Sequence, residues 1–203
     1  MFLIINNNPK NKILLSLRYL ITYFENNNLS FILINNCNDI QDILLNEKLK
    51  KRIKGIILSG SNSSNYNKNI NRNINFLCLI NFDIPILGIC YGHQLIGLFY
   101  NSELKKHNTK QLGQKELFLK KSPLFYKLKD NEDLFVNHNL YLDNIKNNFD
   151  IIARDNKDIV YGIQHKNKPI YGVQFHPELS KNVGTQILDN FIKICKFHRS
   201  FKK

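Results

Sequence analysis

The sequence predicts an α/β fold, in which a central, mostly parallel sheet carries helices on both faces. In the first half of the chain, short apolar segments alternate with stretches whose apolar residues recur at helical spacing. The short segments are apolar throughout, which is typical of parallel strands buried on both faces. In the second half, strand-like segments follow one another with turn residues between them. This change predicts an antiparallel strand region toward the C-terminal end.

The elements of the first half are predicted from their apolar patterns and from the residues that end them. Apolar residues at helical spacing predict a helix over 12–27, which asparagines at 26–28 terminate. Asp39 is a candidate N-cap for a second helix that runs through Leu49. Apolar runs predict strands at 2–6, 30–35, 55–58 and 85–89, and helix-compatible stretches lie near 76–81 and over 93–101.

The second half is predicted to hold short strands and a closing helix. The helix is amphipathic and covers 184–196. A chain of 203 residues with 43% apolar content suits one globular domain. We therefore expect a single domain over residues 1–197 and a basic tail over 198–203. The strands are expected at 116–119, 134–137, 149–154, 160–165 and 169–175.

The strong positive charge does not by itself indicate a nucleic-acid partner. The net charge is +13, and in a nucleic-acid-binding protein such charge gathers in a patch or accompanies a binding motif. Here the lysines are dispersed, and Lys, Asn and Ile, whose codons are rich in A and T, are all abundant. Codon bias explains the charge, so we expect no nucleic-acid partner.

Hydropathy and cysteine usage predict a cytoplasmic protein. No apolar run approaches the roughly 18 residues of a membrane helix, so no membrane association is expected. The start of the chain reads as a strand and not as a signal peptide. The four cysteines are scattered, without disulfide-like or metal-ligand spacing, which predicts free thiols and no metal site. They are Cys37, Cys78, Cys90 and Cys195.

Cys90 is the first candidate for chemistry. It follows an apolar strand and precedes a helix, with Gly88 and Gly92 two residues to either side. This pattern is typical of a tight strand-to-helix elbow that presents a nucleophile, where a larger residue at either glycine would clash. A helix N-terminus also favours a thiolate. A buried core cysteine is the alternative, and the paired glycines argue against it.

His176 and Glu178 supply the groups that a cysteine nucleophile needs. His176 ends a second apolar strand, Pro177 stops the strand, and Glu178 stands within reach of the imidazole. A thiol needs a base to form the thiolate, and the base needs a group that orients it. Parallel strands bring such groups together at their carboxyl ends. Cys90, His176 and Glu178 are therefore the predicted catalytic residues.

A loop of small residues after the third strand is a weaker candidate. It reads Ser59-Gly60-Ser61-Asn62. A loop beside the nucleophile strand can turn a backbone N–H toward a developing oxyanion, and the residue after the nucleophile, Tyr91, supplies a second donor. Gly60, Ser61 and Tyr91 are the predicted oxyanion hole.

The two catalytic segments carry a family resemblance. Gly-Ile-Cys-Tyr-Gly-His-Gln at 88–94 and Tyr-Gly-Val-Gln-Phe-His-Pro-Glu at 171–178 resemble the motifs of class I (triad-type) glutamine amidotransferases. Within that family the chain is most similar to the stand-alone, archaeal-type glutamine amidotransferase subunits of GMP synthases, nearly from end to end. The resemblance implies a flavodoxin-like three-layer sandwich and hydrolysis of glutamine to glutamate and ammonia.

The resemblance also implies roles and partners. Cys90 would form a thioester, His176 would transfer protons and Glu178 would orient His176. Gln94, Asn137 and His138 would hold the amino-acid end of glutamine. No cofactor is expected in this chain. The ammonia would pass to a separate ATP-pyrophosphatase subunit, in a heterodimer, which converts XMP to GMP with ATP and Mg²⁺.

Three segments depart from the family pattern. Asn8-Pro9-Lys10 stands where Gly-Gly-Gln is usual, and Ser61-Asn62 replaces Gly-Pro in the oxyanion loop. Asn137-His138-Asn139-Leu140 stands where the family has Ser-His-x-Asp, a segment that helps the protein sense its partner. Three alternatives therefore stay open. They are an amidotransferase for another synthase, such as anthranilate or aminodeoxychorismate synthase, a catalytically weak regulatory homologue, and a hydrolase of γ-glutamyl compounds that acts alone.

Overall fold

A single curved sheet organises the molecule. The computed structural model describes residues 1–8, 11–35, 43, 46–61 and 83–200, and of residues 199 and 200 the backbone alone. Within these residues the strands follow the order β2-β1-β3-β4-β9-β8-β7-β5-β6. The first five strands pair in parallel and the last four join through antiparallel pairs. The parallel strands are β1 (Phe2–Ile5), β2 (Phe31–Ile34), β3 (Gly55–Leu58), β4 (Ile86–Ile89) and β9 (Ile170–Val173).

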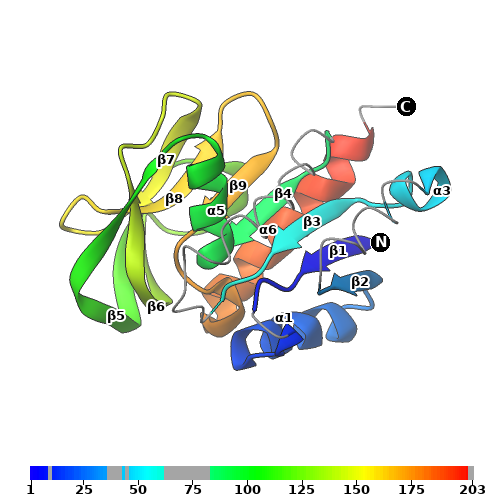
Figure 1. The fold of residues 1–203 in the computed structure, drawn as a ribbon, viewed down its shortest axis with the longest axis horizontal. Coiled ribbons are helices and arrows are strands. Elements are labelled where there is room, and N and C mark those ends of the chain that lie inside the picture. The colour runs from blue at the N-terminus through cyan, green and yellow to red at the C-terminus, as the bar shows by residue number, and fades with distance from the viewer. Residues whose placement is uncertain (9–10, 36–42, 44–45, 62–82, 201–203) are drawn as a thin grey trace.

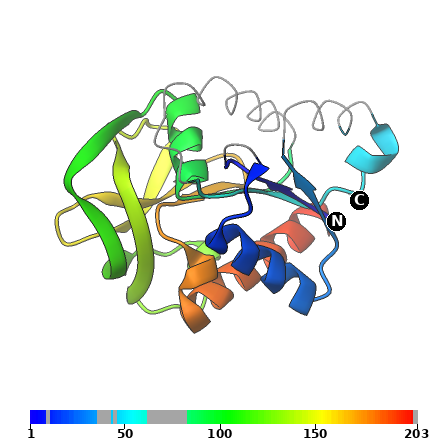
Figure 2. The ribbon, with the colours of Figure 1, turned by 60° about the horizontal axis from the view of Figure 1, so that its bottom comes forward.

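Helices cover both faces of the parallel part, as the sequence predicts. Helices α1 (Leu15–Asn26) and α6 (Lys181–Ser200) lie on one side of the sheet, and α5 (Tyr91–Phe99) lies on the other (Figure 2). Each side has its own hydrophobic core, because alternate side chains of the buried strands point to opposite faces. Tyr23 of α1 donates to Asp189 of α6 at 2.6 Å, which joins the two helices of one layer.

The antiparallel part forms a separate lobe at one end of the sheet (Figure 1). It contains the long hairpin of β5 (Glu103–Leu119) and β6 (Asn131–Asp143), followed by β7 (Phe149–Arg154) and β8 (Val160–His165). The short 3-10 helices η3 (Pro123–Phe125) and η4 (Pro177–Leu179) follow β5 and β9. Since β8 pairs with β9, this lobe is part of the same sheet as the parallel strands.

Most predicted elements are confirmed within a few residues. Strands β3, β7 and β8 have the predicted bounds, while α5 begins two residues earlier than expected and α6 runs from Lys181 to Ser200. The predicted helix from Asp39 falls partly outside the described residues. Within them, α3 (Glu47–Lys50) begins after Asn46, whose side chain accepts from the Leu49 N–H at 3.0 Å. The stretch near 76–81 and Asn62 also lie outside the described residues.

The largest difference from the prediction is the β5–β6 hairpin, which is much longer than the two short strands expected. Most β5 side chains are exposed or half-buried, so the segment lacks the apolar pattern by which strands are recognised. Pairing with β6 along nearly its whole length, interrupted by a register shift between Lys106 and Gln111, holds it extended.

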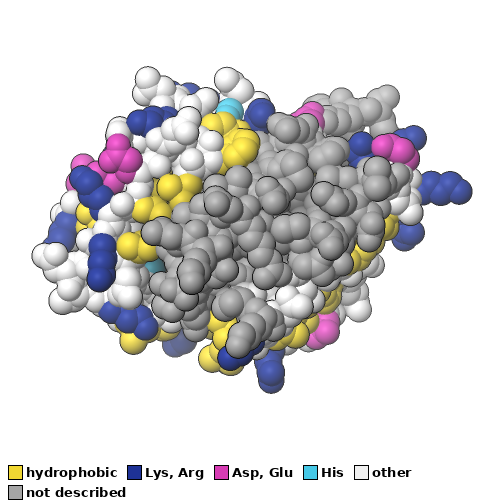
Figure 3. Space-filling view, viewed as in Figure 1, with side chains coloured by type: hydrophobic (Ala, Val, Ile, Leu, Met, Phe, Trp, Pro, Cys, Tyr) yellow, Lys and Arg dark blue, Asp and Glu magenta, His cyan; other side chains and the backbone are white. Residues whose placement is uncertain are grey.

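The surface charge is spread out. On the face shown in Figure 3, the described Lys and Arg side chains are distributed around the rim and do not gather in one patch. This distribution agrees with the dispersed lysines of the sequence. Within the described residues, no helix is long and apolar enough to cross a membrane.

Candidate active site

Cys90 lies on a strained elbow between β4 and α5. Its backbone has φ 50° and ψ −99°, a left-handed conformation that is rare for residues other than glycine. A Cβ on Gly92 would lie 2.3 Å from the carbonyl oxygen of Leu58, and one on Gly88 would lie 2.6 Å from the Gly92 backbone. The two glycines are therefore required for the close packing of the elbow. The Cys90 N–H donates to the Val173 carbonyl at 2.7 Å, which ties the elbow to β9.

The base follows the strand beside the nucleophile. Strands β4 and β9 pair in parallel, with Ile89 opposite Val173, so the residues after each strand meet at one edge of the sheet. His176 lies three residues beyond the end of β9, and its Nδ1 is 2.7 Å from Glu178 Oε1. Both side chains are buried. A proton on Nδ1 that donates to Glu178 leaves Nε2 available to the sulfur.

The charges around His176 favour its protonated form. Burial disfavours the imidazolium, but Glu178 and Cys90 outweigh it and raise the pKa of His176 well above its usual value of 6.5. The contribution of Cys90 to this pKa shows that the sulfur and the imidazole are close enough to interact. The three predicted catalytic residues are thus brought together, in a geometry that can hold a thiolate beside an imidazolium whose orientation a carboxylate fixes.

The predicted oxyanion loop lies against the same pair. A Cβ on Gly60 would lie 2.9 Å from His176 Cε1 and 3.6 Å from Cys90 Cβ, so only glycine fits there without displacement. Ser61 follows it, and Tyr91 is the first residue of α5. Gly60 and Tyr91 therefore both adjoin the nucleophile, and the assignment of Gly60, Ser61 and Tyr91 to an oxyanion hole stays a prediction.

Asn7 supports this loop, a role that the sequence did not reveal. Its side chain donates to the Ser59 carbonyl at 2.6 Å, and its backbone N–H donates to Ser59 Oγ at 3.1 Å. Asn6, Asn7 and Asn8 are all buried. In a chain so rich in asparagine, nothing in the sequence marks these three as different from the asparagines of turns.

The predicted substrate-binding residues lie around the nucleophile, with different orientations. The Asn137 carbonyl is 3.9 Å from Cys90 Sγ. His138 is buried, with Nδ1 2.9 Å from the Leu140 carbonyl, and burial lowers its pKa to about 3. Gln94 is 3% exposed and its amide nitrogen bonds two protein oxygens. Binding of glutamine by these three residues stays a prediction.

A second residue that the sequence left without a role is Gln174. It is fully buried, and its Nε2 lies 3.5 Å from Cys90 Sγ. An uncharged polar residue two positions before the catalytic histidine, at the end of an apolar strand, is the feature by which it could have been recognised.

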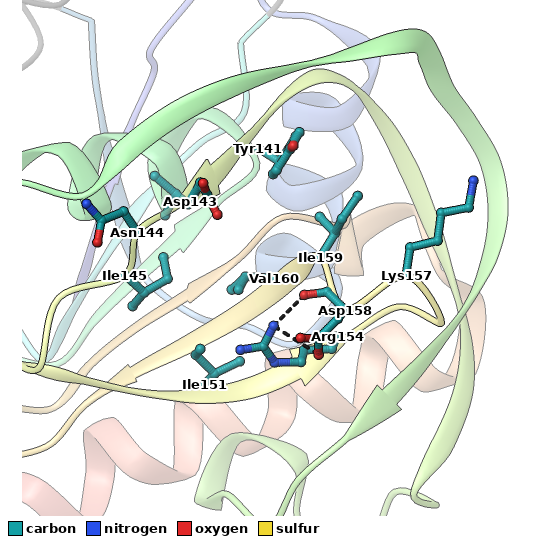
Figure 4. Close-up of a pocket in the computed structure, with 11 residues that line it drawn as sticks. Tyr141, Asp143, Asn144, Ile145, Ile151, Arg154, Lys157, Asp158, Ile159 and Val160 are labelled. Atoms are coloured by element: carbon teal, nitrogen blue, oxygen red, sulfur yellow. Dashed lines mark hydrogen bonds and ion pairs between the residues drawn. The ribbon is translucent and has the colours of Figure 1, made fainter.

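A cavity of about 470 Å³ lies elsewhere, in the antiparallel lobe (Figure 4). None of the three predicted catalytic residues lines it. Its arginine, Arg154, is paired with Asp158 at 3.1 Å, and Lys157 points away from the other lining side chains (Figure 4). Among the described residues, no group of three or more His, Cys, Asp or Glu side chains could hold a metal ion.

Comparison with known proteins identifies the family. Residues 16–195 match the class-I glutamine amidotransferase family, and the chain belongs to it. A glutamine-hydrolysing GMP synthase subunit from Methanococcus aeolicus is 38% identical over 71% of this chain and 76% of its own length. The corresponding GMP synthase subunit from Methanocaldococcus jannaschii is 36% identical over 72% of this chain and 77% of its own length.

Solved structures confirm the fold. A Thermoplasma acidophilum protein named as a subunit of GMP synthase superposes with a TM-score of 0.85, at 24% identity, over 99% of this chain and 96% of its own. A glutamine amidotransferase from Thermotoga maritima gives a TM-score of 0.69 at 18% identity, over 99% of this chain and 84% of its own. The predicted three-layer fold of the class I amidotransferases is therefore confirmed.

Proposed function

We propose that this chain is the glutamine-hydrolysing subunit of a two-chain GMP synthase. The observation that carries the chemistry is the arrangement of His176, whose Nδ1 is 2.7 Å from Glu178 Oε1 and whose ring lies with Cys90 beside Gly60. The names of the relatives, which are glutamine-hydrolysing GMP synthase subunits, support the choice of synthase.

The proposed reaction has two halves. Cys90 Sγ attacks the side-chain amide carbon of glutamine, and the tetrahedral intermediate collapses to a thioester as His176 gives its proton to the departing ammonia. His176 then takes a proton from water, whose oxygen attacks the thioester carbon. Glutamate leaves, and the sulfur regains its starting state. Glu178 holds the imidazole in orientation throughout.

The remaining predicted residues complete the proposal. Backbone N–H groups of the Gly60–Ser61 loop and of Tyr91 stabilise the oxyanion. This oxygen carries the negative charge that develops in each half of the reaction. The segment at Asn137 and His138, with Gln94, holds the amino-acid end of the substrate. No cofactor is assigned to this chain.

The partner is part of the same proposal. A separate ATP-pyrophosphatase subunit takes the ammonia and aminates XMP to GMP, using ATP and Mg²⁺, in a heterodimer with this chain. Relatives named as one subunit of GMP synthase support a second chain. The predicted cytoplasmic location fits a nucleophile that must stay a free thiol.

Ammonia release tests the proposal. The purified chain is incubated with glutamine, alone and with the candidate pyrophosphatase subunit loaded with XMP and ATP. We expect slow release alone and strong stimulation by that partner. Stimulation by an anthranilate-type synthase would instead favour the first alternative. A folded chain that releases no ammonia with any partner would favour the regulatory alternative, which the change to Ser61 motivates.

The nucleophile has its own test. Cys90→Ser should lower ammonia release by several orders of magnitude, because a hydroxyl is a far weaker nucleophile than a thiolate under this base. Cys195→Ser is the matched control, since Cys195 is a buried core thiol packed against Gly55. Retention of most activity in Cys90→Ser would refute the assignment.

A further inference from the structure

Gln174 contacts the sulfur of Cys90 from within the protein core. Its side chain is 0% exposed, and its Nε2 donates to Cys90 Sγ at 3.5 Å. Its backbone N–H donates to the Tyr161 carbonyl at 2.9 Å, which fixes the start of the side chain. Gln174 therefore reaches the reacting atom from a rigid position directly after β9.

The orientation of the Gln174 amide is set by a backbone carbonyl. Gln94 Nε2 donates to the Leu140 carbonyl at 2.8 Å and to Gln174 Oε1 at 2.8 Å. Because the Leu140 carbonyl can only accept, Gln94 must present its NH₂ group to it. That same NH₂ group then requires the oxygen of Gln174, which leaves the Gln174 NH₂ group facing Cys90.

A reversed arrangement has no support from these neighbours. If the Gln174 amide turned over, its NH₂ would face the NH₂ of Gln94, donor against donor, where both side chains are buried. If both amides turned over, the Gln94 oxygen would face the Leu140 oxygen. Both arrangements leave buried polar groups unsatisfied, at a cost of about 1–3 kcal/mol for each group. The chain of bonds therefore has one favoured direction, from Leu140 to the sulfur.

From this geometry we propose that Gln174 is a further catalytic residue, which stabilises the Cys90 thiolate with an amide N–H, and that Gln94 is the positioning residue that orients it. An N–H aimed at sulfur stabilises the thiolate more than the thiol, since the bond to a charged acceptor is the stronger one. The role of Gln174 rests on the proposed function only in that Cys90 is the nucleophile. This role uses Nε2 of Gln94 and is compatible with the contact with glutamine that the proposed function assigns to Gln94.

The test measures the reactivity of the sulfur directly. Iodoacetamide alkylation of the full chain is followed from pH 5 to 10, and the modified peptide holding Cys90 is quantified by mass spectrometry, since three other cysteines are present. Gln174→Met keeps the length of the side chain but has no N–H. We expect the pH midpoint of Cys90 alkylation to rise by about one unit, with roughly tenfold slower alkylation at pH 7.

The matched control is Gln164→Met on the neighbouring strand β8. Gln164 accepts a hydrogen bond from Ser122 Oγ at 2.7 Å, so this variant also removes a glutamine bond from the sheet. Its alkylation midpoint should equal that of the unmodified chain. Equal midpoints in Gln174→Met and Gln164→Met would overturn the proposal. If circular dichroism shows that Gln174→Met does not fold, Gln174→Leu replaces it, since leucine is also uncharged and donates nothing to sulfur.

A double-variant cycle tests the positioning role of Gln94. Gln94→Met should raise the midpoint by less than Gln174→Met, because the amide of Gln174 remains but is no longer oriented. The double variant should show no larger shift than Gln174→Met alone. If the midpoint shift of the double variant equals the sum of the two single-variant shifts, the positioning role of Gln94 is overturned.

These results are independent of glutamine hydrolysis. Alkylation requires neither glutamine nor a second chain. A protein that shows the expected shifts but releases no ammonia would retain the role of Gln174 and refute the proposed function. Ammonia release together with unshifted alkylation midpoints would support the proposed function and refute the role of Gln174.

Discussion

The catalytic residues owe their properties to their immediate neighbours. Glu178 changes the protonation of His176 because the two side chains are buried together, where a carboxylate is poorly screened by water. The identities of Cys90, His176 and Glu178 could be predicted from the sequence, because glycine spacing and His-Pro-Glu at a strand end are local patterns. Asn7 could not, since its contacts come from a strand that is distant in sequence, and for Gln174 the only sequence signal is a polar residue at the end of an apolar strand.

At the residue scale, we predict that Glu178→Gln lowers the pKa of His176. In the unmodified chain that pKa is raised above 6.5, so the folded state keeps a proton that the unfolded state has lost. Stability is therefore full below pH 6.5 and falls as pH rises through the folded pKa, by up to about 1.4 kcal/mol per pH unit. Glu178→Gln should show a shallower fall between pH 6.5 and 9, measured by urea unfolding. Equal slopes of the free energy of unfolding against pH in the variant and the unmodified chain would contradict the prediction.

At the scale of elements, the site exists because β4 and β9 are neighbours. The elbow after β4 and the turn after β9 each supply one half of the catalytic pair. Both strands could be predicted, because they are continuous apolar runs. The β5–β6 hairpin could not be predicted at its true length, because pairing between the two strands, and not burial of an apolar face, keeps residues such as Lys106 and Gln111 extended.

The elbow should tolerate no side chain at Gly92. Its Cβ would collide with the backbone of β3 at 2.3 Å, so Gly92→Ala should cost at least about 2 kcal/mol of stability. It should also slow Cys90 alkylation, since α5 would move. Gly113→Ala is the control: its φ of 114° is strained for alanine, but nothing lies within 4 Å of the new Cβ. It should lose stability without any change in alkylation. Equal alkylation in both variants would contradict the role of the elbow.

At the scale of the whole molecule, two buried histidines make the fold sensitive to acid. Burial lowers the pKa of His93 and of His138 to about 3 in each case. Both are neutral in the folded state, whereas an unfolded chain takes up protons near pH 6.5. Their contribution to stability is present above pH 6.5 and is lost as pH falls toward 3.

We therefore expect the free energy of unfolding to drop between pH 6.5 and 5, before most carboxylates titrate, by up to about 1.4 kcal/mol per pH unit for each histidine. Urea unfolding at several pH values measures the slope. His138→Gln should reduce it. A flat profile for the unmodified chain over this range would refute the expectation.

The position of β4 inside the sheet also determines when the catalytic site can form during synthesis of the chain. On the ribosome, Cys90 is made 84 residues before Gln174, which at about 5–20 residues per second is a delay of roughly 4–17 s. Until β9 has been made, β3 is the only one of its two neighbours with which β4 can pair, and the sulfur has neither its base nor its amide donor. The order of strands thus delays activation of the thiol until β9 and the residues that follow it have been made.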